Sequence, residues 1–326
     1  KQDYIIITPA YNEAEYIERT IKSVVSQSIL PTKWIIVDDG STDQSAQIID
    51  SFAHQDSRIK VITLPENSGV ADAMQAGFEI SSAPYIARMD ADDYNHTTRF
   101  EKQIQLLDSS PSLSAVSCLI EVTGNIAEPD AKPDEGFIRF AKWQNSLIQH
   151  NQIFLDRFVE LPLCNPTMMI RREVYQRLEG YRDFDGPEDF DFWLRFLEEG
   201  YRVEKVAEEL LTWQDREKRL TRSDSRYSQK KFIEKKVEFL SKQSELKDSG
   251  VQILGTGRIA RLIARGLMEN KISVLQFFDV AKKNTEKKIY EIPIRHYTEI
   301  PRQVDCSCFT LIAVGGAGRR RNAENM

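Results

Sequence analysis

Three carboxylates stand within four residues at Asp90, Asp92 and Asp93, directly after the apolar segment 85–89. The apolar segment indicates a short buried strand, and unpaired carboxylates at the end of such a strand are costly. We therefore expect a cation to hold them. A hard divalent metal with oxygen ligands that also bridges to substrate phosphates fits best, so we predict Mg²⁺ or Mn²⁺. The alternative is a solvated Asp-rich turn, which these residues alone do not exclude.

A second acidic pair, Glu188 and Asp189, follows Gly186-Pro187 and precedes an apolar run. Pro187 suits the first turn of a helix, and the two acids then lie at its positive end, which favours their ionised forms. A carboxylate at this position is a candidate general base, and Asp189 is the first choice with Glu188 as its rival. The alternative is an acidic first turn without a catalytic role.

The elements that must position these acids alternate along the first hundred residues. Apolar segments predict strands at 4–8, 34–37, 58–64 and 85–89. Helical periodicity predicts one helix that begins at residue 12 or 13 and two more over 41–53 and 70–81. This alternation indicates βαβ units and a parallel sheet. Ligands of such sheets bind beyond the carboxyl ends of the strands.

Each of the four strands ends in a polar, turn-forming sequence. These sequences are Thr8-Pro9-Ala10-Tyr11-Asn12, Asp38-Asp39-Gly40-Ser41-Thr42-Asp43, Glu66-Asn67-Ser68-Gly69 and Asp90-Ala91-Asp92-Asp93. Any one of them alone is explained as a loop. Because all four fall at one edge of the predicted sheet, together they predict a binding site.

The last third of the chain carries a second pattern. Residues 228–249 predict one Lys-rich helix that packs its apolar face on the protein and links two domains, with binding to anionic lipid as the alternative. Residues 251–254 then predict a strand, followed by Gly255-Thr256-Gly257, a helix, and a strand ending in Asp279. This order resembles a dinucleotide-type turn, which predicts a second nucleotide site at Gly255, Gly257 and Asp279, although such a turn alone is not specific. Alternatively, the glycines only allow close strand–helix packing.

The predicted organisation is thus a domain over 1–227, a helical linker over 228–249 and a small, truncated Rossmann-like α/β domain over 250–326. The 326 residues are 41% hydrophobic and 29% charged, as in ordinary globular proteins. The net charge of −6 argues against a nucleic-acid partner. No apolar run is long enough to span a bilayer. We expect a cytoplasmic protein that can associate peripherally with the inner face of the plasma membrane.

The motifs in their order resemble glycosyltransferase family 2 over residues 3–225. They are T-P-A-Y-N, V-D-D-G-S-T-D, N-x-G, M-D-A-D-D and P-E-D-F-D-F-W-L-R. The segment from Trp213 through Arg216 to Arg222 looks like the one that closes this domain in members for bacterial surface polysaccharides. The resemblance implies a GT-A fold, a nucleotide-diphospho-sugar donor, most commonly a UDP-sugar, a divalent metal, and inversion at the anomeric carbon. The acceptor would be a hydroxyl of a glycan or lipid-linked molecule in cell-surface polysaccharide biosynthesis.

The resemblance also assigns roles to residues. The metal would lie on Asp90 and Asp92, with Asp93 as a third ligand or a contact of the donor ribose. Contacts to the donor nucleotide would come from Thr8, Pro9, Tyr11, Asn12, Asp38, Asp39, Asn67 and Asp90. Two positions depart from the family pattern. Residues 70–74 lack the usual Arg-Asn pair, so Arg88 or Arg99 is expected to contact the phosphates. Asn165 stands where many relatives have His.

Two other functions fit parts of the pattern. A nucleotidyltransferase also combines an α/β sheet with metal-binding acids. It usually has a loop rich in glycine and basic residues after the first strand, where this chain has T-P-A-Y-N. A non-catalytic sensor of sugar nucleotides or dinucleotides would use the C-terminal domain. The presence of Asp90, Asp92 and Asp189 argues against a protein without catalysis.

Overall fold

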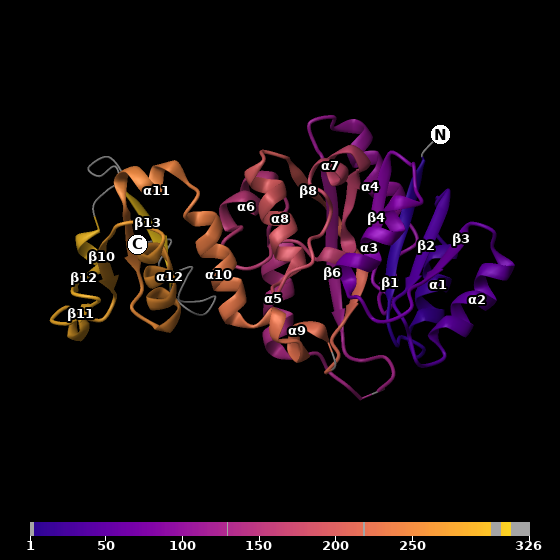
Figure 1. The fold of residues 1–326 in the computed structure, drawn as a ribbon, viewed down its shortest axis with the longest axis horizontal. Helices are drawn as coiled ribbons and strands as arrows, with labels where there is room; N and C mark the ends of the chain where they lie inside the picture. The colour runs from indigo at the N-terminus through magenta and orange to yellow at the C-terminus, as the bar shows by residue number, and fades with distance from the viewer. Residues whose placement is uncertain (1–2, 129, 218, 301–307, 314–326) are drawn as a thin grey trace. The chain divides into compact units, whose positions relative to one another are not determined.

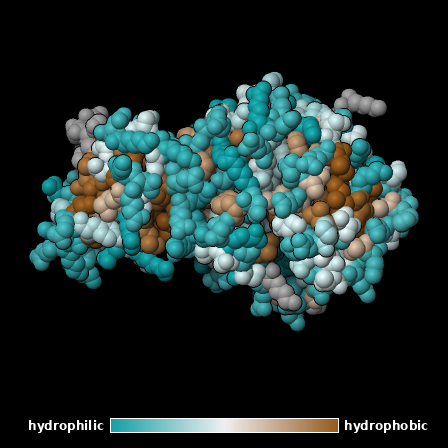
Figure 2. Space-filling model, viewed as in Figure 1, coloured by the Kyte–Doolittle hydropathy of each residue, from teal (hydrophilic) through white to brown (hydrophobic). Residues whose placement is uncertain are grey.

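The computed structural model describes residues 3–128, 130–217, 219–300 and 308–313. The chain divides into two compact units, residues 1–223 and residues 224–326, and each is described by itself (Figure 1). Within the described residues, none of the helices is long and apolar enough to cross a membrane. Hydrophilic side chains cover most of the face seen in Figure 2, with smaller hydrophobic areas between them.

The first part of the larger unit is the predicted alternation of strands and helices. Its strands are β1 (Tyr4–Ala10), β2 (Lys33–Asp38), β3 (Ile59–Thr63) and β4 (Tyr85–Arg88), and its helices are α1 (Ile17–Val25), α2 (Ser45–Gln55) and α3 (Val70–Glu79). The strands are parallel in the order β3-β2-β1-β4. The predicted parallel sheet is confirmed, and its carboxyl ends lie at one edge.

The second part extends this sheet with antiparallel pairs. The strands β7 (Met169–Arg171), β6 (Ala115–Thr123), β8 (Val203–Gln214) and β5 (Tyr94–Asn95) follow β4 in that order, giving eight strands. The pairs β4–β7, β7–β6 and β8–β5 are antiparallel, whereas β6–β8 is parallel. The remaining helices of this unit are α4 (Arg99–Ser109), α5 (Glu135–Ser146), α6 (His150–Asp156), η1 (Asn165–Thr167), α7 (Arg172–Arg177), α8 (Glu188–Glu198) and α9 (Leu220–Ser223).

The core lies on both faces of β1. Ile5, Ile6 and Ile7 are at most 1% exposed, because a central parallel strand is covered on both sides. Trp34 of β2 is also buried, and its Nε1 donates a hydrogen bond of 3.0 Å to Thr8 Oγ1. Burial of that hydroxyl and indole is therefore compensated. Such a rigid sheet holds the loops at its carboxyl edge in fixed places.

The smaller unit contains a five-stranded sheet in the order β11-β12-β10-β9-β13. Its strands are β9 (Val251–Leu254), β10 (Val274–Asp279), β11 (Lys288–Ile289), β12 (Ile292–His296) and β13 (Phe309–Ile312), with α12 (Arg258–Glu269) after β9. Four of the strands are parallel, in a Rossmann-like order. Residues 314–326 lie outside the described residues.

The single helix predicted over 228–249 is wrong. Two helices occupy this stretch, α10 (Gln229–Leu240) and α11 (Ser244–Ser249). The amides of Lys242 and Gln243 donate to the carbonyls of Phe239 and Leu240, three residues back. These tight turns end α10, and Gln243 is extended before α11 begins. The sequence lacks Gly or Pro at this break, so periodicity alone continues through it.

Candidate functional site

Residues 90–93, which we call the acid loop, follow the end of β4. Thr20 of α1 holds the loop's backbone, because its Oγ1 lies 2.8 Å from Ala91 O and 2.9 Å from Asp93 O. Gln214 at the end of β8 donates from Nε2 to Asp92 O. The shape of the acid loop is thus set by bonds to its carbonyls, and its carboxylates are left for other partners.

Two guanidinium groups meet these carboxylates. Arg88 Nε lies 2.9 Å from Asp90 Oδ1, and Arg216 Nη2 lies 2.6 Å from Asp92 Oδ2. Asp93 is 1% exposed, and among the described residues neither of its carboxyl oxygens has a hydrogen-bond partner. Burial, followed by the neighbouring carboxylates, raises the pKa of Asp93 well above its usual range. Burial also raises the pKa of Asp92, with Arg216 opposing. The charge of Arg219 also opposes both shifts, so burial and the repulsion between carboxylates make a further negative charge in the acid loop unfavourable.

The predicted divalent metal can be tested against this arrangement. In the described ranges, no three His, Cys, Asp or Glu side chains converge as a complete ligand set. The side chains of Asp90 and Asp92 are 30% and 15% exposed, so both remain accessible. Mg²⁺ usually binds one or two carboxylates and completes its shell with phosphates and water. These two accessible carboxylates fit such an ion, whose charge would also relieve the repulsion between them, and Asp93 as a third ligand stays a prediction.

The loops after β1 and β2 are joined to each other by hydrogen bonds. Asn12 has φ +54°, a conformation that Asn tolerates, and its Oδ1 accepts the amide of Thr42 at 2.8 Å. The amide of Asn12 donates to Ser41 Oγ at 3.0 Å, and the amide of Ala14 donates to Asp43 Oδ2 at 3.1 Å. Asn12 therefore shapes the predicted donor site. Tyr11 beside it is 42% exposed, which leaves its ring available for stacking.

Asp38 and Asp39 have different surroundings. Asp38 is 1% exposed, and its Oδ1 accepts the amide of Ser41 at 3.2 Å. Both oxygens of Asp39 accept amides at 2.8 Å, from Ser68 and Gly69, so Asp39 anchors the loop that contains the exposed Asn67. Gly40 between these loops has φ +70°, and a Cβ there would meet the backbone of residues 66 and 67 at 2.7–2.9 Å.

Two predicted donor contacts, Thr8 and Pro9, lie inside β1. The Thr8 side chain is fully buried against Trp34, so it supports the strand from within. Pro9 is half-buried and lies opposite Val37 of β2. The structure therefore brings Tyr11, Asn12, Asp38 and the acid loop to one edge, with Thr8 and Pro9 one step further inside the sheet.

The candidate base lies in the first turn of α8. Asp189 is half-buried and Glu188 is 8% exposed, so Asp189 is the more accessible of the two. Burial, followed by the charge of Glu188, raises the pKa of Asp189 to about 7, while Arg88 opposes this shift and Asp90 adds to it. The pKa of Asp189 thus depends on charges at the acid loop. The two predicted parts of the site therefore lie within electrostatic range of each other.

A buried polar network that the sequence reasoning missed connects these two parts. The ring of Tyr181 lies 5.3 Å from the Arg88 guanidinium, and its hydroxyl donates to Asn165 Oδ1 at 2.8 Å. Trp193 Nε1 donates to the same oxygen at 3.2 Å. Because an indole N–H can only donate, these contacts fix the orientation of the Asn165 amide. Within the described part of the chain, Asn165 Nδ2 and Arg88 Nη1 are buried without hydrogen-bond partners.

The other feature missed by the sequence reasoning is Arg216, just after β8. Its Nη1 and Nη2 donate to Glu13 Oε2 and Oε1, each at 2.8 Å, in addition to the Asp92 contact. Burial, followed by the charge of Asp92, raises the pKa of Glu13 to about 7, although Arg216 opposes the shift. The only available signal was the W-Q-D-R segment, which indicated a closing element but no partner 203 residues away.

Arg88 and Arg99, the expected phosphate contacts, have separate roles. Arg88 lies beside Asp90, as described above. Arg99 is fully buried and donates to Gln103 Oε1, Asn95 Oδ1, Arg88 O and Pro166 O. The side chain of Arg99 therefore joins the end of β4 to η1, and it positions the site from within the protein.

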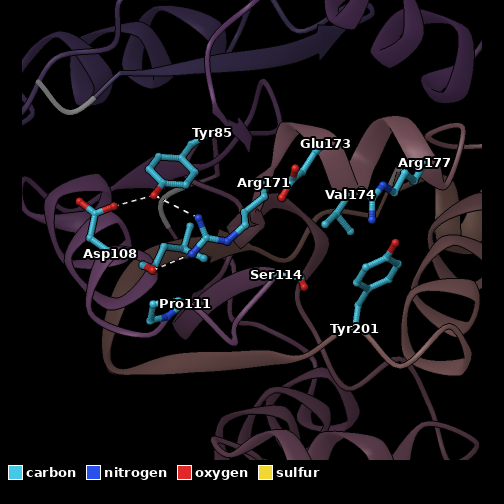
Figure 3. Close-up of a pocket in the computed structure, with 10 residues that line it drawn as sticks. Tyr85, Asp108, Pro111, Ser114, Arg171, Glu173, Val174, Arg177 and Tyr201 are labelled. Atoms are coloured by element: carbon cyan, nitrogen blue, oxygen red, sulfur yellow. Dashed lines mark hydrogen bonds between the residues drawn. The ribbon is translucent and has the colours of Figure 1, made fainter.

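A pocket of about 410 Å³ lies at the opposite edge of the sheet, near the amino end of β4 (Figure 3). Arg171 extends into it, donating to Tyr85 Oη at 3.3 Å and to Leu107 O at 2.8 Å, and Tyr85 Oη donates to Asp108 at 2.5 Å. None of the predicted site residues lines this pocket. The side chains of Arg171, Tyr85 and Asp108 bond to one another there, which indicates a structural network.

In the smaller unit, the predicted second nucleotide site follows β9. Asp279, expected to bind a ribose, accepts hydrogen bonds from Thr256 Oγ1, from Asn284 Nδ2 at 2.9 Å and from the amide of Ala281 at 2.8 Å. These bonds tie the strand ends of the unit together. Gly257 has open space where a Cβ would be, and Gly255 has φ +129°. A nucleotide at Gly255, Gly257 and Asp279 stays a prediction.

A family model described as glycosyl transferase family 2 matches residues 5–179. The chain belongs to glycosyltransferase family 2. The matched residues include the donor loops, the acid loop and η1, whereas Asp189 and Arg216 lie beyond them. Membership of this family confirms the predicted type of enzyme and favours it over a nucleotidyltransferase.

Named relatives in this family agree with the match. The putative glycosyltransferase EpsE of Bacillus subtilis is 32% identical over 63% of this chain and 70% of its own length. The putative teichuronic acid biosynthesis glycosyltransferase TuaG of the same organism is 31% identical over 60% of this chain and 72% of its own length. An uncharacterized glycosyltransferase of Haemophilus influenzae is 31% identical, and the match spans 58% of each chain.

Solved structures of low identity show the same fold. S. aureus TarS in complex with UDP has a TM-score of 0.55 at 16% identity, covering 81% of this chain and 70% of that one. The mannosyltransferase PcManGT from Pyrobaculum calidifontis, in complex with GDP-Man and Mn²⁺, has a TM-score of 0.51 at 16% identity, covering 82% and 72%. These similarities confirm the predicted GT-A fold for this family 2 chain.

Proposed function

We propose that this protein transfers a sugar from a nucleoside-diphospho-sugar to a hydroxyl group of a glycan or lipid-linked acceptor, with inversion, in cell-surface polysaccharide biosynthesis. The observation that carries the proposal is the position of Asp189. This carboxylate is half-buried, and burial and the charges of its neighbours, Arg88 and Asp90 among them, set its pKa at about 7. A general base works best when its pKa lies near the operating pH. TuaG, named for teichuronic acid biosynthesis, supports the pathway class.

In the proposed reaction, Asp189 accepts the proton of the acceptor hydroxyl. The hydroxyl oxygen forms a bond to the anomeric carbon as the bond from that carbon to the diphosphate oxygen breaks, and the nucleoside diphosphate leaves with the electron pair. Glu188 is a weaker candidate for the base because it is buried, and neighbouring residues on a helix point in different directions. Asp189 acts as a base and not as a nucleophile in this reaction, so the displacement is direct and inverts the anomeric carbon.

On the donor side, Tyr11 would stack on the nucleobase and Asp38 would accept a hydrogen bond from it. Asn12 and Asp39 would hold the loops that form this pocket, through the amides they bind. Asp90 and Asp92 would hold Mg²⁺ or Mn²⁺, which when bound supplies positive charge to the leaving diphosphate. Arg88, beside Asp90, adds a fixed positive charge from the protein.

The donor class is supported by the ligands of structures with this fold, which are UDP and UDP-GlcNAc for TarS and GDP-Man for PcManGT. We propose a UDP-sugar first. Donor hydrolysis over a panel of UDP-, GDP- and dTDP-sugars, with Mn²⁺, with Mg²⁺ and with EDTA, tests donor and metal without an acceptor.

Two variants separate the proposed roles. Asp92→Asn should abolish the metal-dependent turnover of the donor. Asp189→Asn should still bind donor and metal but lose about 10²–10⁴-fold in transfer. If Asp189→Asn transfers sugar at the wild-type rate, Asp189 is not the base. If EDTA leaves turnover unchanged, the metal at Asp90 and Asp92 is refuted.

A further inference from the structure

The contacts of Arg216 place one cation between two acids of different loops. Its guanidinium binds Glu13 with two hydrogen bonds of 2.8 Å, and the same Nη2 lies 2.6 Å from Asp92 Oδ2. The plane of the guanidinium also lies over Tyr16, with Cζ 4.5 Å from the ring centroid. The side chains of Arg216, Glu13 and Asp92 are 15–17% exposed. Arg216 is thus shared between Glu13, which it binds through both terminal nitrogens, and Asp92, which it meets through one.

We infer that Arg216 is the resident cation of Asp92 in the metal-free protein, that a divalent metal displaces it from Asp92, and that Glu13 then retains it beside the donor diphosphate. The inference rests on the proposed function, because it requires a metal at Asp90 and Asp92. A guanidinium at 2.6 Å and a divalent ion compete for the same carboxylate oxygen, since two cations so close repel each other strongly. The bidentate bond to Glu13 does not involve Asp92 and survives the exchange.

A second observation indicates an oxygen ligand for Arg216. Its Nε is buried and has no hydrogen-bond partner among the residues that the structure describes. A buried donor without an acceptor is costly, and a diphosphate oxygen is the kind of acceptor that guanidinium groups bind best. After the metal takes Asp92, Arg216 has Nε and part of Nη2 to donate. Glu13 is therefore a positioning residue that acts through Arg216.

The inference predicts opposite changes in Mn²⁺ affinity when Arg216 and when Glu13 is replaced. Arg216→Met removes the competing cation, so Mn²⁺ alone should bind more tightly, on the order of tenfold. Glu13→Gln leaves Arg216 with a neutral partner, so its charge is neutralised by Asp92 alone and Mn²⁺ should bind more weakly. A merely structural role for the pair would weaken metal binding in both variants, because both would loosen the acid loop.

The experiment measures free Mn²⁺ by electron paramagnetic resonance in titrations without nucleotide, followed by UDP binding at saturating Mn²⁺. We expect Arg216→Met to bind UDP about tenfold more weakly despite its tighter metal site. Arg139→Met is the control, because Arg139 is exposed and pairs with Glu135 at 3.3 Å. It should leave both affinities unchanged. Circular dichroism verifies that each variant is folded, and Glu13→Gln keeps the test valid if Arg216→Met does not fold.

The outcomes separate the inference from the proposed function. If wild type binds Mn²⁺, Asp92→Asn does not, and Arg216→Met binds Mn²⁺ equally or more weakly, the exchange is refuted while the metal site stands. The same holds if Glu13→Gln tightens Mn²⁺ binding. If wild type binds no Mn²⁺ without nucleotide, the exchange is refuted; if it binds none in the presence of UDP either, the Mn²⁺ part of the proposed function is refuted as well.

Discussion

The pKa of Asp189 determines how transfer should depend on pH. Burial and the neighbouring Glu188 raise this pKa to about 7 from the ordinary 3.8 of an aspartate. A protonated carboxyl cannot accept the acceptor's proton, so kcat/KM should fall about tenfold per pH unit below 7. With a pKa of about 7, roughly 1% of Asp189 is ionised at pH 5, whereas an ordinary aspartate would be more than about 90% ionised there.

The perturbation that tests this cause is Glu188→Gln. It removes the like charge next to Asp189 and keeps the size of the side chain, so the acidic limb of the pH profile should move to lower pH. Initial rates of transfer are measured from pH 5 to 9 at constant ionic strength, with Asp189→Asn as the reference without a base. An unmoved limb in Glu188→Gln, or the same limb in the residual activity of Asp189→Asn, would refute the reasoning.

A stability measurement checks the same pKa without any substrate. Because the folded-state pKa of Asp189 is raised above its unfolded value, the folded protein binds the extra proton more tightly. The stability linked to that proton is present below pH 4 and is lost as the pH rises to about 7. Asp189→Asn cannot ionise, so it should be more stable than wild type at pH 8, by at most about 4 kcal/mol, and the difference should shrink toward pH 4. Urea unfolding at both pH values measures it.

Arg99→Met should lower the free energy of unfolding by about 3–5 kcal/mol, because it leaves buried carbonyls at the end of β4 and in η1 without donors. The exposed Arg139→Met is the control, with an expected change below about 0.5 kcal/mol. Burial lowers the pKa of Lys205 to about 7. Between pH 7 and 9 the unfolded chain keeps this proton while the folded protein loses it, so the free energy of unfolding of wild type should rise with pH. Lys205→Met should lack this rise in urea unfolding. Asp39→Ala removes the acceptor of two loop amides and should lose about 1–3 kcal/mol of stability. It should also weaken UDP binding measured by calorimetry, whereas an unchanged affinity would contradict the role of Asp39 in shaping the donor site.

The sequence predicted which loops meet at the carboxyl edge of the sheet, because their placement follows from local patterns. Apolar strands alternating with helices specify a parallel sheet, and a parallel sheet places every strand's carboxyl end at one edge. Asn12, Asp38 and the acid loop therefore had to lie close together wherever the helices packed. The roles within the set were less predictable. Both carboxylate oxygens of Asp39 accept loop amides, and Thr8 accepts the indole N–H of Trp34, so these two polar side chains are used within the protein.

The surroundings of Asp90 and Asp189 were harder to predict because their contacts are long-range. Arg88 looks like part of an apolar strand in the sequence, which does not show that its guanidinium lies over the ring of the distant Tyr181. Asn165 has a fixed amide orientation because of Trp193, which lies 28 residues away. The pairing of Glu13 with Arg216 depends on where β8 ends relative to α1, and no local periodicity carries that information.

The acid loop combines an unfavourable charge with a rigid backbone, and the two features are connected. The guanidinium groups of Arg88, Arg216 and Arg219 act on its carboxyl groups, yet burial and the repulsion between carboxylates still raise the pKa values of Glu13, Asp92 and Asp93. If the carboxylates themselves held the loop together, its shape would change whenever a cation arrived or left. The bonds from Thr20 and Gln214 go to carbonyl oxygens instead, and these do not titrate. The loop can therefore exchange one cation for another while its geometry is kept, which is what repeated binding and release of a charged donor requires.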